Sequence, residues 1–261
     1  MIHPTAIVDP SAELGDVELG PYVVVGPRVR LHDRVRLGAH SVVESDTEIG
    51  PGTVLHAHVV LGGAPQDLKH DPSVNTTLVV GADNVFREFT TAHRGTSAGR
   101  GTTRIGSRNY FMANSHVAHD CWVGDDVMFA NSAAIAGHVD VGNGAILGGL
   151  SAVHQHARVG RLAMVGGGAM CAQDVPPFTL AQGDRARLYG VNIVGLRRAG
   201  LGDSASAALK DAWRVLFASD LPWKTALTRV DEAHGSVPEV AELLTFLRGS
   251  TRGVCRAGVQ T

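Results

Sequence analysis

Histidine is unusually frequent in this chain, and several histidines recur at spacings that would bring them together in a repeating structure. The sequence contains 13 histidines against 23 lysines and arginines. His119, His138 and His156 are separated by 19 and then 18 residues, and His154 lies two positions before His156. If a structural unit repeats every 18 residues, we expect these imidazoles to form a ladder along one edge of the fold. Such an array suits a general base, a metal site or a solvated edge.

One histidine of this ladder has a carboxylate as its chain neighbour, since Asp120 directly follows His119. Adjacent side chains of a flat strand point to opposite faces, so the two groups can meet only at a corner. An Asp–His pair suits a general base that takes a proton from a hydroxyl group near neutral pH. Gly137 leaves its backbone N–H open to close approach, and such a donor stabilises an oxyanion.

A six-residue repeat must position these residues. Large hydrophobic residues occupy every sixth position in two runs, and the residues two places earlier are small or β-branched. Helices repeat every 3.6 residues and strand meanders alternate over longer stretches, so neither explains the pattern. Three hexads make one 18-residue coil of a triangular prism. The two runs are Leu19, Val25, Leu31, Leu37, Val43, Ile49, Leu55 and Leu61, and then Ile105, Phe111, Val117, Val123, Phe129, Ile135, Val141, Leu147, Val153, Val159 and Val165.

This pattern predicts an all-β fold, the left-handed parallel β-helix of hexapeptide-repeat proteins, with a small C-terminal α-helical domain. Nine or ten coils stacked about 4.8 Å apart would give a prism roughly 45 Å long. Glycine follows the 18-residue period at Gly106, Gly124, Gly142 and Gly160.

The repeat is interrupted twice and then stops, which sets the expected domain organisation. Residues 62–79 and 94–104 do not follow the six-residue step and are rich in turn formers, so we expect two loops inserted into the prism. We therefore assign residues 1–188 to the β-helix and residues 189–261 to the helical domain.

Within the second domain, apolar spacing predicts a helix over 205–218, and Pro222 could begin another through Val230. Ser236 and Glu239 have the spacing of a capping box before a helix that ends at Gly249.

Composition excludes several classes of protein. Of the 261 residues only 18 % are charged and the net charge is −2, which argues against a nucleic-acid-binding surface. No apolar run approaches the ~20 residues that span a bilayer, and the N-terminus lacks the pattern of a signal peptide. Three cysteines without a CxxC pair favour the cytoplasm. Cys121 and Cys171 fall on inward positions of the repeat and are expected to be core residues.

Several strings along the chain carry a family resemblance. They resemble the acyl-[acyl-carrier-protein]–UDP-N-acetylglucosamine O-acyltransferases, which begin lipid A biosynthesis, over about residues 1–256. The strings AHDC and QDVPP are far more specific than the hexad alone. The full set is QDLK (66–69), HRGT (93–96), NSHVAHDC (114–121), AGHV (136–139), AVHQ (152–155), MVGG (164–167), QDVPP (173–177), GVNIVGLRR (190–198) and STRG (250–253).

The resemblance implies a role for each matching residue. His119 would be the base that deprotonates the glucosamine 3-hydroxyl, Asp120 would orient it, and the Gly137 N–H would stabilise the oxyanion. Asp67 and Lys69 would contact sugar and phosphate from across a subunit boundary of a homotrimer. The remaining substrate-binding residues implied are His116, His138 and His154 along the cleft, with Gln155, Asn192 and Arg198 on the nucleotide.

The resemblance also implies the substrates. The donor would be a 3-hydroxyacyl chain on the phosphopantetheine of acyl carrier protein, and the acceptor UDP-N-acetylglucosamine. No cofactor or metal is needed, because the thioester supplies an activated acyl group. Gly167 matches the position that limits the depth of the acyl chain, and a glycine there implies about fourteen carbons rather than ten. Met164 and Met170 are the next candidates for this limit.

Two departures from the family pattern fall at the nucleotide-binding end. Val194 replaces a glutamate and Ala199 replaces an arginine, which leaves a modified acceptor, such as a 3-amino sugar, open. Other functions remain compatible with the prism. One is a related hexapeptide N-acyltransferase, although that family typically carries an additional N-terminal domain. Another is a zinc carbonic anhydrase-like enzyme that uses the histidine ladder. A third is a non-catalytic β-helix scaffold.

Overall fold

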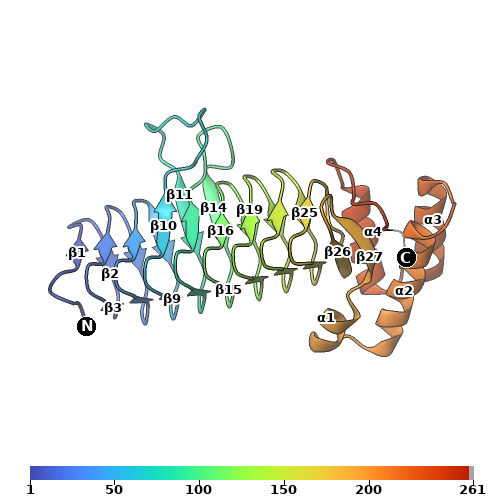
Figure 1. Cartoon of the computed structure of the whole chain (residues 1–261), viewed down its shortest axis with the longest axis horizontal. Helices are drawn as coiled ribbons and strands as arrows, with labels where there is room; N and C mark the ends of the chain where they lie inside the picture. The colour runs from blue at the N-terminus through green and yellow to red at the C-terminus, as the bar shows by residue number, and fades with distance from the viewer. Residues whose placement is uncertain (259–261) are drawn as a thin grey trace.

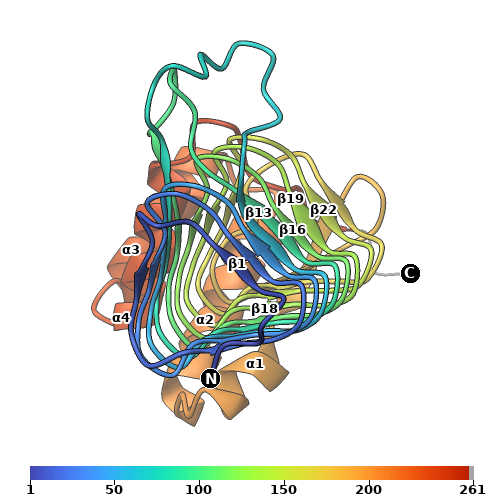
Figure 2. The same ribbon diagram turned by 90° about the vertical axis from the view of Figure 1, so that its left-hand side faces the viewer.

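The chain forms a triangular prism followed by a small helical domain (Figure 1). This computed structural model describes residues 1–258. Very short strands occupy the three sides of the prism in turn, and the chain bends at a corner after each of them. Figure 2 looks along the prism and shows the triangular section, with one pair of long loops leaving a single corner. The predicted parallel β-helix is confirmed.

Three sheets form the sides of the prism and are named here by their first strands. The β1 sheet contains β1 (Ile7–Val8), β4 (Val24–Val25), β7 (Val42–Val43), β10 (Val60–Gly63), β13 (Thr91–His93), β16 (His116–Val117), β19 (Ala134–Ile135), β22 (Ala152–Val153) and β25 (Met170–Cys171). The β2 sheet contains β2 (Glu13–Leu14), β5 (Arg30–Leu31), β8 (Thr47–Ile49), β11 (Thr77–Val80), β14 (Thr102–Ile105), β17 (Trp122–Val123), β20 (Asp140–Val141) and β23 (Arg158–Val159).

The β3 sheet forms the third side and reaches furthest toward the C-terminal end. It contains β3 (Glu18–Leu19), β6 (Arg36–Leu37), β9 (Val54–Leu55), β12 (Val85–Phe86), β15 (Tyr110–Phe111), β18 (Met128–Phe129), β21 (Ile146–Leu147), β24 (Met164–Val165), β26 (Thr179–Gln182) and β27 (Arg187–Val191). All pairings are parallel except that of β26 with β27, which reverses the chain at the end of the prism.

Inward side chains fill the prism without gaps between coils. All nineteen hydrophobic positions of the two six-residue runs are buried, as the repeat predicts. Equivalent residues of successive coils pair directly, so Phe111 lies over Phe129 with ring centroids 4.9 Å apart. Cys121 and Cys171 are buried free thiols, as expected for core residues. The core is therefore a continuous stack along the whole prism.

The corners form three edges that run the length of the prism. We call them the loop edge, between the β1 and β2 sheets; the third edge, between the β2 and β3 sheets; and the ring edge, between the β3 and β1 sheets. Most corners contain one residue with positive φ, which turns the chain sharply. At the ring edge these residues stack as rings about 5.0 Å apart, namely Tyr22, His40, His58 and Phe89.

Both inserted loops project outward from the loop edge. They cover residues 64–76 and 94–101, and are shorter than predicted because β10, β11, β13 and β14 extend into their ends. The two loops touch, since Ser97 Oγ accepts a hydrogen bond from the Asp71 N–H at 2.9 Å. They form one projection above the prism (Figures 1 and 2).

The C-terminal part contains four helices: α1 (Ile193–Arg198), α2 (Asp203–Phe217), α3 (Trp223–His234) and α4 (Pro238–Arg248). The capping box predicted at Ser236 is wrong. Val237 is the N-cap of α4 and makes no side-chain cap, because Pro238 occupies the first turn and presets its geometry. Within residues 1–258, no helix is long and apolar enough to cross a membrane.

The chain after α4 returns to the prism, and hydrogen bonds there link the helical domain to the last coil. Asp174 is buried at the last coil and accepts hydrogen bonds from the Arg158 guanidinium at 2.8 Å and from Ser250 Oγ at 2.9 Å. Arg158 also donates to the Phe246 carbonyl of α4 at 3.0 Å. The helical domain is therefore bonded to the prism by a buried carboxylate as well as by apolar packing.

The 18-residue glycine period follows from close approach of neighbouring coils. A Cβ on Gly142 would lie 2.5 Å from the Arg161 nitrogen, which is backbone and cannot move aside alone. We expect Gly142→Ala to destabilise the fold by about 2–4 kcal/mol, because two coils must separate locally. Thermal unfolding of purified protein measures this loss. Gly202→Ala is the matched control: its Cβ meets no atom within 4 Å, so an equal loss there would contradict the steric explanation.

Candidate functional site

The predicted Asp–His pair forms at the loop edge, directly after β16. His119 Nδ1 lies 2.9 Å from Asp120 Oδ2, and the side chain of His119 is only 12 % exposed. The corner makes this contact possible, because Asp120 has φ of 60° and its carboxylate turns back beside its neighbour. With Nδ1–H donating to Asp120, Nε2 of His119 is left to accept a proton.

Asp120 is held as a carboxylate. It is completely buried, and burial alone would raise its pKa. Hydrogen bonds from His119 and from Thr96, together with the charge of His138, outweigh burial and lower the pKa of Asp120 to about 2. The pair therefore carries a fixed negative charge next to the imidazole that would become positive during proton transfer.

The other histidines of the ladder lie in register around this pair. His138 and His156 stack with ring centroids 4.4 Å apart, and His138 meets the ring of His119 edge-on at 5.2 Å. Desolvation, followed by neighbouring histidines, lowers the pKa of His93 to about 4, and the same causes lower the pKa of His116. The neutral form is therefore favoured for His93 and His116, whose ring centroids lie 4.8 Å apart.

Gly137 lies in the coil next to His119, and its missing side chain has a clear reason. A Cβ there would lie 2.4 Å from Cε1 of His119, so any other residue would displace the ring. Among residues 1–258 we find no acceptor for the Gly137 N–H. This donor beside the imidazole is the group that the sequence predicts for an oxyanion.

The cluster His119, Asp120 and His138 also has the composition of a metal site, with ligand atoms within 4.8 Å of one another. The bonding of Asp120 disfavours that function. Its Oδ1 accepts from the Arg100 N–H at 2.7 Å and its Oδ2 from Thr96 Oγ1 at 2.6 Å, besides His119. A metal ion would have to displace several of these donors, so the arrangement suits a general base better than a ligand set.

A cleft of about 360 Å³ opens beside this pair on the outer face of the β1 sheet. Its floor is made by small side chains, since Ala134 and Ala152 point outward from β19 and β22. His154 borders this face and its Nδ1 lies 2.8 Å from Arg252 of the C-terminal segment. The lining includes Gln66, His93, His116, His119, Gly137 and Gln155.

Other predicted site residues lie away from this cleft within the single chain. Asn192 caps α1 through Gly195 and donates to the Leu162 carbonyl at 2.9 Å, which places it at the third edge. Arg198 is exposed in the last turn of α1, on the side of the prism opposite the inserted loops (Figures 1 and 2). Val194 is exposed on this helix, and Ala199 is its C-cap.

The residues expected to limit acyl depth lie at the other side of the β1 sheet. Gly167 is at the ring edge, where an added Cβ would meet only the Gly149 carbonyl oxygen, at 3.4 Å. Met164 points outward from the neighbouring β3 sheet. The outer face of the β1 sheet thus connects His119 at one edge with a glycine notch at the other.

The sequence predicts that Asp67 and Lys69 contact sugar and phosphate across a subunit boundary, and this stays a prediction. Gln66, directly before Asp67, lines the same cleft as His119 of the same chain. Sequence reasoning also overlooked two participants, His93 in the cleft and Thr96 on Asp120. The string HRGT holds both, but its six-residue frame is broken there, so no register predicted where they would lie.

Comparison with known proteins identifies the family of this chain. Residues 174–255 match the family described as UDP N-acetylglucosamine O-acyltransferase, domain 2, and residues 28–63 match the bacterial transferase hexapeptide family. Acyl-[acyl-carrier-protein]–UDP-N-acetylglucosamine O-acyltransferase of Thermodesulfovibrio yellowstonii is 46 % identical over 98 % of this chain and 99 % of its own. That of Caulobacter vibrioides is 47 % identical over 97 % of both chains.

The solved structures give the same result. The crystal structure of UDP-N-acetylglucosamine O-acyltransferase from Moraxella catarrhalis superposes with a TM-score of 0.94, at 39 % identity, over 98 % of this chain and 99 % of that one. The left-handed β-helix with a small helical domain is therefore confirmed. Because the chain is 46–47 % identical to the Thermodesulfovibrio yellowstonii and Caulobacter vibrioides relatives over 97–98 % of its length, it belongs to the acyl-[acyl-carrier-protein]–UDP-N-acetylglucosamine O-acyltransferase family.

Proposed function

We propose that this enzyme moves a 3-hydroxyacyl chain from acyl carrier protein to the 3-hydroxyl of UDP-N-acetylglucosamine, the first step of lipid A biosynthesis, with His119 as the base. The observation that carries the proposal is the buried, ionised Asp120 hydrogen-bonded to Nδ1 of a largely buried histidine at the cleft. Its free Nε2 suits a hydroxyl acceptor, because an alcohol must lose its proton to attack a thioester.

The chemistry then follows from three groups. His119 Nε2 takes the proton as the sugar oxygen bonds to the thioester carbonyl carbon, and Asp120 stabilises the imidazolium. The Gly137 N–H donates to the oxyanion of the tetrahedral intermediate. When the intermediate collapses, the carbon–sulfur bond breaks and the leaving thiolate takes the proton from His119. No cofactor enters this balance, since the thioester is already activated.

The acyl chain is proposed to cross the outer face of the β1 sheet. Ala134 and Ala152 offer a smooth apolar floor next to His119, and Gly149 and Gly167 leave a notch at the ring edge. Each methylene buried along this path contributes about 0.8 kcal/mol. A long chain is favoured because, among residues 1–258 and apart from its chain neighbours, no side-chain atom lies within 4 Å of a Cβ built on Gly167.

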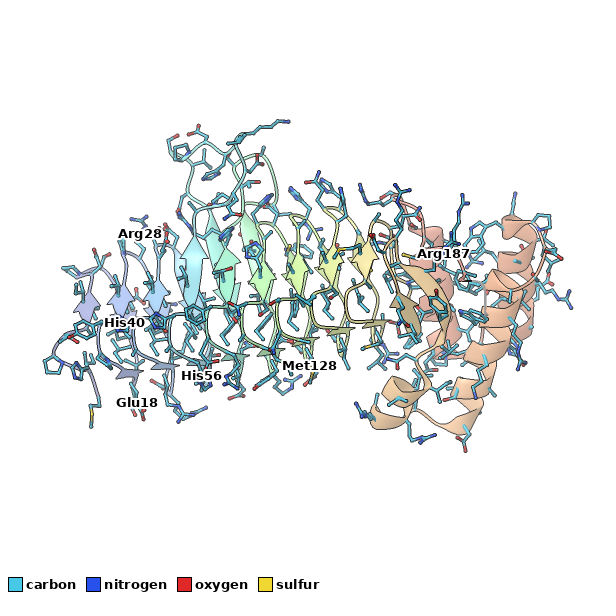
Figure 3. The ribbon with its side chains drawn as sticks, viewed as in Figure 1. Glu18, Arg28, His40, His56, Met128 and Arg187 are labelled. Carbon is cyan, nitrogen blue, oxygen red and sulfur yellow. The ribbon has the colours of Figure 1, made fainter. Side chains whose placement is uncertain are left out.

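The three outer faces differ in a way that supports a homotrimer. Outward residues of the β2 sheet are mostly charged, whereas those of the β1 sheet, and those of the β3 sheet from β9 to β26, are uncharged and largely apolar. Met128, for example, projects from the β3 sheet and is 37 % exposed (Figure 3). Three prisms can bury both apolar faces if the β1 sheet of each copy packs against the β3 sheet of the next.

This packing would also assemble the site. It brings the loop edge of one copy, with His119, beside the third edge of the next copy, with Asn192 and Arg198. Those residues are too far round the prism to serve the cleft of their own chain. We therefore propose that Arg198 reaches the nucleotide across the subunit boundary, while Asp67 and Lys69 hold the sugar in their own subunit.

Two further features bear on substrate and location. Val194 and Ala199 lie on or beside α1, so the departures from the family pattern affect the nucleotide end and not the acyl transfer. The three cysteines are buried free thiols, which fits action in the reducing cytoplasm. The donor there would be acyl carrier protein.

The role of His119 is tested by its removal. We expect His119→Ala to lower kcat by about 10²–10⁴, because general-base catalysis of this kind contributes that much. Folding should be unaffected, since the ring packs at the surface of the coil. Turnover with UDP-N-acetylglucosamine and 3-hydroxyacyl carrier protein measures the effect, and circular dichroism checks the fold. A folded variant with near-normal turnover would exclude His119 as the base.

Mixed trimers test the shared site. His119→Ala and Arg198→Ala subunits, each inactive as homotrimers, should regain activity when co-assembled, because some interfaces then contain both intact residues. His119→Ala mixed with Asp67→Ala should stay inactive if both residues serve one chain's cleft. Light scattering verifies the trimer. A monomer, or no recovery in the first mixture, contradicts the shared site; recovery in the second shows that the loop crosses the boundary.

The acyl path is tested at its far end. Gly167→Met should shift preference toward shorter donors, because four lost methylene contacts are worth at most about 3 kcal/mol, or up to ~100-fold in selectivity. The kcat on the shortest donor should hardly change, since the base is untouched. The measurement is kcat/KM for donors of ten, twelve and fourteen carbons. An unchanged ranking would make Gly167 a turn residue and move the limit to Met164 or Met170.

A further inference from the structure

The second inserted loop encloses the carboxylate that orients the base. Residues 94–101 leave the loop edge and return directly over Asp120, which has no exposed surface. Thr96 Oγ1 donates to Asp120 Oδ2 at 2.6 Å, and the Thr96 N–H lies 3.1 Å from each carboxylate oxygen. The N–H groups of Arg100 and Gly101 donate to Oδ1 at 2.7 and 3.1 Å.

The residue types of the loop fit this close wrapping. A Cβ on Gly99 would lie 2.5 Å from Asp120 Oδ2, so only glycine lets the backbone pass there. Gly101 has φ of +70°, which allows the turn that aims its N–H inward. Thr96 itself is 1 % exposed, so its hydroxyl has no contact with solvent.

The loop is also fixed from outside. The Arg100 guanidinium lies 4.4 Å from the centre of the Trp122 ring and donates to the Asp120 carbonyl at 3.1 Å and to Asp140. These contacts hold the loop against the β2 sheet. The donors on Asp120 are consequently set in place before any substrate binds.

We propose that Thr96 is a positioning residue for acyl transfer: its buried hydroxyl holds Asp120 Oδ2 in the orientation that receives Nδ1–H of His119. Both donors share this one oxygen, since His119 Nδ1 lies 2.9 Å from it and Thr96 Oγ1 lies 2.6 Å from it. The proposal rests on the proposed function of His119 as the base.

Loss of the hydroxyl has two consequences for the imidazole. Oδ2 loses its shortest hydrogen bond and keeps the Thr96 N–H and His119 as partners, so the hydrogen bond to His119 is less well aligned. The carboxylate also becomes a stronger acceptor, because Thr96 no longer lowers the pKa of Asp120. The titratable and charged groups that face Asp120 are His119, His138, Arg100 and the Cys121 thiol.

The test compares Thr96→Val, which keeps the shape and loses the hydroxyl, with Thr96→Ser, which keeps the hydroxyl. We expect Thr96→Val to lower kcat about tenfold or more, as loss of a hydrogen bond to a charged group does. The KM for UDP-N-acetylglucosamine should stay within about twofold. Thr96→Ser should restore kcat to within about threefold of the unmodified enzyme. If Thr96→Val does not fold, Thr96→Ala removes the same hydroxyl without placing a methyl group against the carboxylate.

A double variant separates this role from a structural one. In the His119→Ala background, Thr96→Val should cause no further loss of kcat, because Thr96 acts only through the missing imidazole. An additive loss there, or an unchanged kcat in the single variant, would overturn the proposal. If His119→Ala itself remains active, the proposed function fails instead, which this design distinguishes.

Discussion

Parallel stacking of coils at one strand spacing is the constraint on which the rest of this structure depends. Each outward residue has a neighbour about 4.8 Å above and another below it, so its surroundings are determined by residues one coil away. The pairing of His138 with His156 and the fit of the His119 ring against Gly137 both arise in this way. A catalytic group on such a scaffold needs no folded pocket of its own, because the adjacent coil supplies the partner.

The electrostatics of the site follow from the same stacking. Histidines of adjacent coils lie in contact. Burial, followed by the charge of neighbouring histidines, lowers the pKa of His93 and of His116, so the neutral form of both is favoured. One ionised carboxylate, Asp120, lies among them and is compensated by directed hydrogen bonds rather than by an ion pair with arginine. The site therefore holds a single negative charge next to the one imidazole whose Nδ1 contacts it, which distinguishes His119 from its neighbours.

Residues that follow the six-residue repeat could be placed from the sequence, whereas residues in the inserted loops mostly could not. Period and register were enough to place the buried runs, the Asp120–His119 corner and the open N–H of Gly137. Thr96 and His93 were not predicted, because the six-residue repeat is interrupted around them and gives no register from which their neighbours could be inferred. A second limit concerns neighbouring subunits: which subunit a residue such as Asn192 or Asp67 serves depends on how whole prisms pack, and the repeat carries no information on that packing. The false capping box at Ser236 arose because Pro238 alone is enough to start that helix.

The corners have a consequence for how such an enzyme can change length during evolution. Removal of six residues from the prism would preserve every inward side chain, yet it would rotate all later residues by one face and carry His119 away from the loop edge. Only whole coils of 18 residues can be gained or lost without separating the base from the loops that enclose it. Smaller changes are confined to the corners, where the chain already leaves the prism at residues 64–76 and 94–101. The architecture thus restricts changes in the length of the prism to multiples of 18 residues, whereas a segment that leaves the prism at a corner can change length without altering the register of the coils.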